Sequence, residues 1–452
     1  MNHQLKRQFE AENDDFLLRM LLDDDEEDIY MLQRWWRRRQ QQRVQDQVRR
    51  NQKPPRERWN YLKRGDLLPN PRDLSSWLGI YNSREDRAYL KVLGVNVPTF
   101  DFLLNSGFAE AWNTRPIART DTNSHGATRI GGRSLDAAGG LGLLLYYLCN
   151  TMDECGLQVI FAIIPSTVSR YISFAMGIML EILQRLPVAR IEWPDEDLMA
   201  EYSNLITNKH SHAEYLDGAF GFMDGLNLPV QTPNDQEEQE PFFNGWLHAH
   251  IVGNVLIFAP DGTIIAARIN TPGSWHDSRR ALPLYDLIRD TPTGFFIIAD
   301  SAFPKLTVTY KVTNEEGNEE EQEDQKIKVP LKGGARVRGT AEYIDRVTQE
   351  SKEVTSARQA VEWGMRAIQG CFSRLYVPLD VNRSDQRANL LEVCFRLHNV
   401  RTRMIGINQI TSVYVGALPG IHGNNRPLPC QIYPSRAHLI AHIQHFQNGL
   451  RH

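Results

Sequence analysis

The sequence of 452 residues predicts a mixed α/β domain preceded by an all-α region. Apolar residues keep helical spacing from about residue 75 to residue 186, and strand-like apolar runs begin near residue 215. Long helical segments return after residue 355. The order strand, hairpin, helix, strand and helix is typical of a mixed sheet with helices packed on it.

Composition excludes several classes of protein. Hydrophobic residues make up 41% and charged residues 23%, which excludes fully disordered, collagen-like and coiled-coil chains. The longest apolar run, 141–149, is far shorter than the roughly 20 residues of a membrane-spanning helix, so we expect no membrane partner. The residues before Trp35 lack the apolar core of a secretion signal. Five cysteines without a CxxC pair fit reduced thiols inside the cell.

The net charge of −4 hides an uneven distribution. Residues 14–28 are mostly acidic, residues 34–64 form a basic block, and a second acidic run covers 315–324. The basic block has two interpretations: an arm that touches DNA or directs import into the nucleus, or a solvated tail. We expect a nuclear protein, with passage through the cytoplasm left open.

Four parts are expected along the chain. Residues 1–73 form a disordered, charged arm with one helix at about 30–48, and residues 74–205 form a helical region. Residues 206–404 form the α/β domain, and residues 405–452 form a C-terminal tail.

The helical region carries a predicted helix-turn-helix. The segment 161–164 reads as a short turn, and Pro165 after it suits the first position of a new helix. The first turns of a recognition helix can present polar side chains to phosphates and base edges. The candidates are Ser166, Thr167, Ser169 and Arg170. Alternatively, this is the ordinary turn of a three-helix bundle.

Strands and helices alternate in the α/β domain. The run 249–258, the turn 260–262 and the run 263–269 predict a β-hairpin. The other expected elements are strands at 219–228, 295–299 and 327–331, a helix beginning near 275, an acidic loop at 314–325, and helices at 355–375 and 387–404.

Four carboxylates occupy positions that indicate a site. Asp224 and Asp300 are expected to end strands, Asp277 follows the segment 271–276, and Glu362 lies on the long helix. An isolated buried carboxylate is costly, and a divalent cation relieves that cost. Carboxylates that converge on two Mg²⁺ or Mn²⁺ ions can support phosphodiester hydrolysis by activated water.

Each carboxylate also has a structural interpretation. The two strand-ending aspartates can belong to turns, and Asp277 can sit in the first turn of a helix. Glu362 is flanked at four residues by Arg358 and Arg366, which is the spacing of a surface ion-pair ladder.

Six segments in order along the chain carry a resemblance to a known family. They are Phe222–Gly225, Phe243–Trp246, Pro272–Ser278, Ile298–Pro304, Ser356–Gly364 and Arg396–Arg401. Together, over about residues 99–401, the chain resembles the PIF/Harbinger superfamily of DDE transposases and the nucleases derived from it. The sequence departs from the family pattern at Ala299 and Phe303, where glycine and tyrosine are usual.

The resemblance implies an RNase H-like catalytic domain. Asp224 on the first strand, Asp300 on the fourth and Glu362 on a later helix would be the catalytic, metal-binding triad, and Asp277 a further acidic position of the metal site. It implies Mg²⁺ or Mn²⁺ as cofactor and double-stranded DNA as partner. A Myb-like DNA-binding protein is a further implied partner, and a homo-oligomer is left open.

We therefore expect a divalent-metal-dependent DNA endonuclease or transposase. The alternative is a domesticated, non-catalytic DNA-binding or chromatin-associated adaptor that retains the fold. A third candidate is an RNA-directed nuclease of the same fold. All four acids are present, which favours an enzyme.

Overall fold

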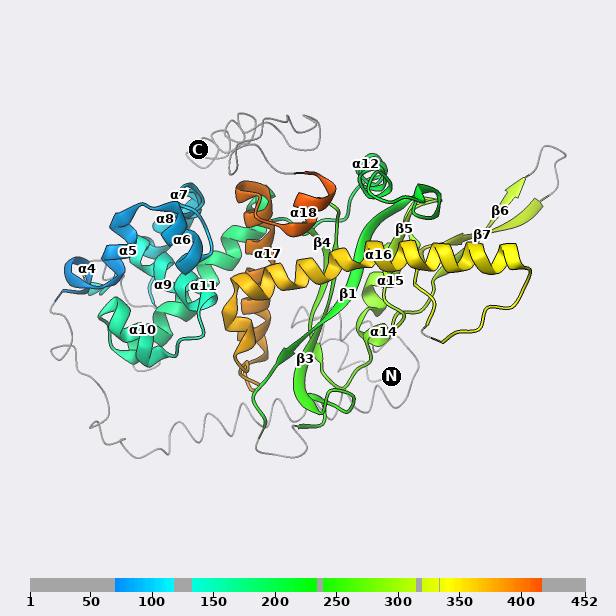
Figure 1. The fold of residues 1–452 in the computed structure, drawn as a ribbon. Helices are drawn as coiled ribbons and strands as arrows, with labels where there is room; N and C mark the ends of the chain where they lie inside the picture. The colour runs from blue at the N-terminus through cyan, green and yellow to red at the C-terminus, as the bar shows by residue number, and fades with distance from the viewer. Residues whose placement is uncertain (1–69, 118–131, 234–238, 314–318, 333, 417–452) are drawn as a thin grey trace. The chain divides into compact units, whose positions relative to one another are not determined.

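A computed structural model describes residues 70–117, 132–233, 239–313, 319–332 and 334–416. By its contacts the chain divides into residues 1–61 and 62–452, and every described residue lies in the second unit (Figure 1). Most of the expected N-terminal arm, including its helix at 30–48, lies outside the described residues. So does the expected tail beyond residue 416.

The first part of the described chain is helical, as expected. Asp136 caps α9, because its Oδ1 accepts a hydrogen bond of 2.7 Å from the amide of Gly139. Helices α10 and α11 are joined by residues 162–164 and bent by 92°, which confirms the two helices and the turn. The α-helices are α4 (Pro71–Leu74), α5 (Trp77–Ser83), α6 (Asp86–Leu93), α7 (Val97–Leu103), α8 (Ala109–Thr114), α9 (Ala137–Cys149), α10 (Glu154–Phe161), α11 (Pro165–Arg185) and α12 (Glu196–Thr207).

Shorter helical turns complete this part. A π-helical turn covers Leu104–Phe108, and 3₁₀ turns cover Pro187–Ala189 and Ala213–Tyr215. No single helix among the described residues is long and apolar enough to cross a bilayer, whereas α10 and α11 meet that criterion only as a bent pair.

The second part is a mixed sheet with helices on both faces. Strands β1, β3 and β4 are antiparallel neighbours, and β1, β5 and β8 are parallel neighbours. The predicted hairpin is confirmed as β3 and β4. The strands are β1 (Ala219–Pro229), β2 (Phe243–Asn244), β3 (Ala249–Phe258), β4 (Ile264–Pro272), β5 (Phe296–Ala299) and β8 (Ile327–Lys328). The helices are α14 (Asp277–Arg280), α15 (Leu282–Arg289), α16 (Ala341–Cys371), α17 (Ser384–Ile405) and α18 (Gln409–Tyr414), with a 3₁₀ turn at Ser373–Tyr376.

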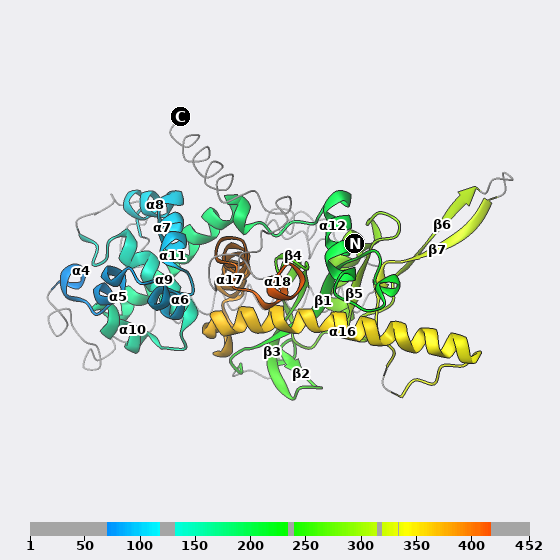
Figure 2. The same ribbon diagram turned by 45° about the horizontal axis from the view of Figure 1, so that its top comes forward.

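Each face of the sheet has its own hydrophobic core. One face packs against α16 and α17, and α16 crosses β1 in both ribbon views (Figures 1 and 2). The other face packs against α12 and α15. Helix α16 begins 14 residues earlier than the expected 355, so it is a single helix of 31 residues.

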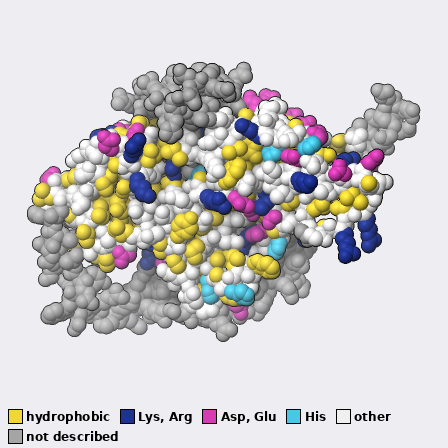
Figure 3. Space-filling view, in the orientation of Figure 1, with side chains coloured by type: hydrophobic (Ala, Val, Ile, Leu, Met, Phe, Trp, Pro, Cys, Tyr) yellow, Lys and Arg dark blue, Asp and Glu magenta, His cyan; other side chains and the backbone are white. Residues whose placement is uncertain are grey.

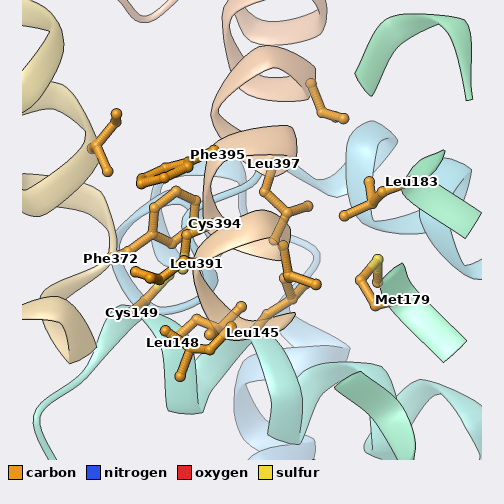
Figure 4. Packing of buried hydrophobic residues seen from close by; sticks show 14 of the residues in the cluster. Leu145, Leu148, Cys149, Met179, Leu183, Phe372, Leu391, Cys394, Phe395 and Leu397 are labelled. Atoms are coloured by element: carbon orange, nitrogen blue, oxygen red, sulfur yellow. The ribbon is translucent and has the colours of Figure 1, made fainter. Parts of the chain in front are cut away.

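Helix α17 joins the helical region to the sheet. It contacts α11 on one side and β4 on the other. Figure 4 shows Leu391, Cys394 and Leu397 of α17 among side chains from α9 and α11, such as Leu145 and Met179. One continuous core therefore supports both parts.

The segment Arg396–Arg401 braces the β3–β4 hairpin. His398 Nε2 lies 3.0 Å from the carbonyl oxygen of Gly262, and burial lowers the His398 pKa to about 4. The side chain of Asn399 bonds both the amide and the carbonyl of Ile264. These two residues of the family-like motif therefore hold the hairpin against α17.

The acidic stretch at 314–325 is not a loop throughout, so that expectation is wrong in part. Residues Glu319–Gln325 form β7, which pairs with β6 (Thr307–Thr313) in a separate two-stranded ribbon. Opposite charges face each other across the ribbon, because Lys311 is paired with Glu321. At its base, Asp324 and the buried Lys326 form an ion pair of 2.5 Å.

We expect Gly364→Ala to lower the free energy of unfolding by about 1–3 kcal/mol, because a Cβ there would lie 2.8 Å from the ring of Phe258 on β3. Urea unfolding of the purified protein checks this. The control is Gly177→Ala on α11, where no atom lies within 4 Å of the added Cβ; helix propensity should stabilise that variant by up to about 1 kcal/mol. Equal effects of the two variants would contradict the close packing of α16 on the sheet.

Candidate active site

The register of two parallel strands brings Asp224 and Asp300 together. Met223 of β1 pairs with Ala299 of β5, so the two aspartates occupy the next position on neighbouring strands, which are about 4.8 Å apart. Both Met223 and Ala299 belong to the core on the α12 and α15 side. Since side chains alternate, Asp224 and Asp300 are directed to the face that α16 covers.

The expected strand at 219–228 is confirmed as β1, but the expectation that Asp224 ends a strand is wrong, because Asp224 lies within β1. Strand β1 continues to Pro229 because its antiparallel pairing with β3 continues to that residue. The parallel neighbour β5 ends at Ala299, so Asp224 occupies the position where one edge of β1 loses its partner. Asp300 directly follows its strand, as predicted.

Both aspartates are oriented in the same way. Oδ1 of Asp224 accepts a hydrogen bond of 2.7 Å from the amide of Gly225, and Oδ1 of Asp300 accepts one of 2.7 Å from the amide of Ser301. One carboxylate oxygen of each residue is thus used to fix the side chain. The second oxygen is left for a further partner.

Arg358 links Asp224 to Glu362. Its Nη1 lies 3.4 Å from Asp224 Oδ2, and its Nη2 lies 3.3 Å from Glu362 Oε1, one helical turn away on α16. Arg366 Nη2 lies 3.9 Å from Glu362 Oε2, which confirms the expected ion-pair ladder. The side chains of Asp224, Arg358 and Glu362 are 24%, 22% and 42% exposed. Figure 3 shows acidic and basic side chains together along the middle of α16.

The surroundings of Asp224 disfavour the ionised form of its side chain. Burial raises its pKa to about 6, and the charges of Asp300 and Asp277 raise it as well. The amide of Gly225 and the guanidinium of Arg358 act in the opposite direction. An additional cation close to Asp224 would stabilise its ionised form and lower its pKa.

Asp277 lies on the other face of β1. A Cβ added to Gly225 would lie 3.0 Å from Asp277 Oδ1, and residue 225 is directed away from α16 because its neighbour 224 is directed toward it. Asp277 is the first residue of α14, and its Oδ1 lies 2.8 Å from Nη1 of Arg280. This supports the first-turn interpretation of Asp277, and its role as a metal ligand stays a prediction.

Arg280 is a site residue that the sequence reasoning missed. Its side chain is 1% exposed, and besides Asp277 it donates to Asn227 Oδ1 at 2.6 Å and to the carbonyl of Gly273 at 2.8 Å. It thereby holds the segment before α14 against β1. The i, i+3 spacing of Asp277 and Arg280 was the available signal.

The carboxylates of this site are the kind of ligand that a hard divalent cation prefers. They are not close enough together in this structure to coordinate one ion. No group of three or more His, Cys, Asp or Glu side chains among the described residues is close enough to hold a metal ion. Arg358 bridges Asp224 and Glu362. Carboxylate oxygens on Asp224, Asp300 and Glu362 are nevertheless the ligands that Mg²⁺ and Mn²⁺ prefer.

The four helix-turn-helix candidates lie on α11, whereas the carboxylates lie on β1, directly after β5, and on α14 and α16. Ser166 is exposed, whereas Thr167, Ser169 and Arg170 are half-buried. Arg170 is directed back along its own helix: Nε donates to the carbonyl of Ser166 at 2.8 Å, and Nη2 donates to Thr167 Oγ1 at 3.4 Å. Contact of these residues with DNA stays a prediction.

Without metal, Asp224→Asn should raise the free energy of unfolding above pH 6 by about 1–3 kcal/mol. The raised pKa means that the folded protein holds this proton more tightly than the unfolded chain, so ionisation costs stability as pH rises from about 4 to 6. Urea unfolding in EDTA at pH 7.5 and pH 4.5 checks this, with the exposed Asp197→Asn as control. A gain that grows toward low pH would contradict the shift.

Comparison with known proteins gives a match for the part of the chain that contains the carboxylates. No curated protein and no solved structure matches the chain. Residues 223–399 match the family model of the DDE superfamily endonuclease. The match begins one residue before Asp224, ends at Asn399, and includes Asp277, Asp300 and Glu362. The region that contains the carboxylates is therefore similar to a DDE superfamily endonuclease domain.

Proposed function

We propose that the protein is a divalent-metal-dependent DNA endonuclease of the PIF/Harbinger transposase type. One observation carries the proposal: Asp224 on β1 and Asp300 directly after β5 occupy the next position beyond the Met223–Ala299 pair of two parallel strands, on the face covered by the helix that bears Glu362. The match of residues 223–399 to DDE endonucleases supports it.

The strand arrangement supports an RNase H-like fold for this domain. An antiparallel β1, β3 and β4 is followed by β5 and β8, which extend the sheet in parallel from β1. Leaving aside the two-residue β2, Asp224 is on the first strand and Asp300 follows the fourth. Those are the places that the family resemblance assigns to the first two acids.

The proposed chemistry is hydrolysis of a phosphodiester bond. A bound divalent cation would supply an electrophile for the phosphate and a water of lowered pKa. Asp224 and Asp300 would hold it through the oxygens that their neighbouring amides leave free, and Glu362 would complete the triad. A 3′ hydroxyl released by cleavage would be available for strand transfer.

Arg358 has two roles in this proposal. In the metal-free protein it offsets the repulsion between Asp224 and Glu362. With a cation bound by the carboxylates, the Arg358 guanidinium would be available to a DNA phosphate, for which its planar pair of donors is suited.

The remaining expectations belong to the same proposal. The first turns of α11 would contact duplex DNA, and the protein would act in the nucleus. A Myb-like partner and a homo-oligomer would fit a transposase that recognises element ends. Antibody localisation and co-purification of a second DNA-binding protein test these points independently of the active site.

One observation favours a second candidate, a non-catalytic DNA-binding adaptor with the same fold. Arg358 already forms ion pairs with Asp224 and Glu362, so both carboxylates have a cationic partner in the protein itself. An adaptor would retain DNA binding and lack cleavage with either Mg²⁺ or Mn²⁺.

Asp224→Asn and Asp300→Asn should each abolish Mg²⁺-dependent nicking of supercoiled plasmid, because each removes an anionic ligand while keeping side-chain size and the Oδ1 hydrogen bond. Circular dichroism checks that the fold is retained, and Asp197→Asn is the exposed control. Cleavage by both variants at the rate of the unmodified protein would refute the assignment. Absence of cleavage by the unmodified protein would favour the adaptor.

Arg358→Gln should tighten Mn²⁺ binding several-fold, because it removes a positive charge from between two ligands. Titration calorimetry of the metal-free protein measures this without reference to activity. Arg366→Gln is the matched control, since Arg366 lies farther from Glu362 and is 76% exposed. Weaker Mn²⁺ binding by Arg358→Gln would show instead that Arg358 orients the carboxylates for the metal.

A further inference from the structure

On the face of α16 that bears Glu362, none of the residues that precede Glu362 is acidic. Positions on this face recur at three or four residues. Going back from Glu362 they are Arg358, Thr355, Ser351, Thr348 and Ile344. A chain of phosphates lying along this face would therefore meet no like charge.

The nearby glutamates of α16 are engaged elsewhere. Glu350 forms an ion pair of 3.7 Å with Lys328 of β8, and Glu353 lies 3.1 Å from His210 Nδ1. Their partners lie off the Glu362 face. Glu350 and Glu353 therefore have partners of their own and do not contribute to the Glu362 face.

A basic loop, of which the structure describes residues 331–332 and 334–340, begins on this same face. The amide of Leu331 donates a hydrogen bond of 3.0 Å to Ser351 Oγ, which fixes the start of the loop to the helix. Lys332, Arg336 and Arg338 are exposed, and none forms an ion pair within the described residues. Figure 3 shows basic side chains projecting at the edge where this loop lies.

The distances along α16 fit a DNA duplex. Ser351 precedes Glu362 by eleven residues, about 16 Å along the axis, and Thr340 precedes it by 22 residues, about 33 Å. At about 3.4 Å per base pair, the basic loop would be five to ten base pairs from a phosphate at Glu362. That range corresponds to between half a turn and one turn of B-DNA.

The neighbouring ribbon restricts where the duplex can lie. Strand β7 presents the exposed Glu321 and Glu323, which repel phosphates. The basic loop and the acidic ribbon thus flank the N-terminal half of α16 with opposite charges. The favourable side for DNA is the side of the basic loop.

We propose that the Glu362 face of α16 and the basic loop form a phosphate-binding track. The DNA on one side of the cut follows α16, and Lys332, Arg336 and Arg338 neutralise its phosphates five to ten base pairs away. The track rests on the proposed function, since it takes the same DNA as the carboxylate site. It adds a binding surface outside the carboxylate cluster.

The test is the salt dependence of DNA binding by a triple variant, Lys332→Ala with Arg336→Ala and Arg338→Ala. Fluorescence anisotropy with a duplex of about three turns, in EDTA, gives the slope of log K against log salt. Loss of three phosphate contacts should make the slope shallower by about 3 and weaken binding at least about tenfold at moderate salt.

A matched control removes three exposed cations that lie outside both α11 and the basic loop: Arg87→Ala, Lys91→Ala and Lys209→Ala. It has the same net charge as the triple variant and should change the slope by less than about one. An unchanged slope for the loop variant, or an equal change in the control, would overturn the track. Circular dichroism confirms that both variants are folded.

Cleavage separates the track from the proposed function. If the unmodified protein cuts DNA and the loop variant keeps its salt slope, the track alone is wrong. If the unmodified protein binds DNA with the expected slope difference but does not cut with Mn²⁺, the track stands and the nuclease proposal fails. Hydroxyl-radical footprints that lose protection five to ten base pairs from the cut only in the loop variant would support both.

Discussion

The parallel register of β1 and β5 is the constraint on which the rest of the site depends. It sets Asp224 beside Asp300 on one face of the sheet, where burial and mutual repulsion raise the Asp224 pKa to about 6. A positive charge nearby stabilises the ionised forms of two carboxylates in that position. In the protein itself Arg358 supplies it, and the same requirement makes the position attractive to a divalent cation.

Close packing of α16 allows Arg358 to reach β1. The residues of α16 that face the sheet are small near the site, namely Ala357, Ala360 and Gly364, and all three are buried. The ring of Phe258 fills the space that a Cβ on Gly364 would need. A helix this close places the next positions around its circumference, Arg358 and Glu362, beside the end of β5. The packing of α16 on the sheet thus determines the positions of Arg358 and Glu362 in the site.

Local patterns in the sequence were enough to predict the hairpin, most helices and the carboxylates, because periodicity and turn residues act over a few positions. Contacts between distant segments were not predictable in this way. The sequence showed Arg358 four residues from Glu362, but its contact with Asp224 depends on how α16 crosses β1. The face occupied by Asp277 depends on strand alternation about Gly225. Residues 319–325 form strand β7 through pairing with β6, and a run of glutamates carries no local signal of that pairing.

Under the proposed function, the position of Arg358 would couple metal binding to DNA binding. A phosphate that draws the guanidinium away from Asp224 and Glu362 leaves the carboxylates more negative, so a cation binds them more tightly. By linkage, a bound cation that frees the guanidinium must strengthen DNA binding by the same factor. The proposed track would add DNA affinity from the basic loop, outside the carboxylate cluster, and would so raise the occupancy by DNA at a given metal concentration. A nuclease of this kind would bind its metal ion most tightly when DNA is already bound.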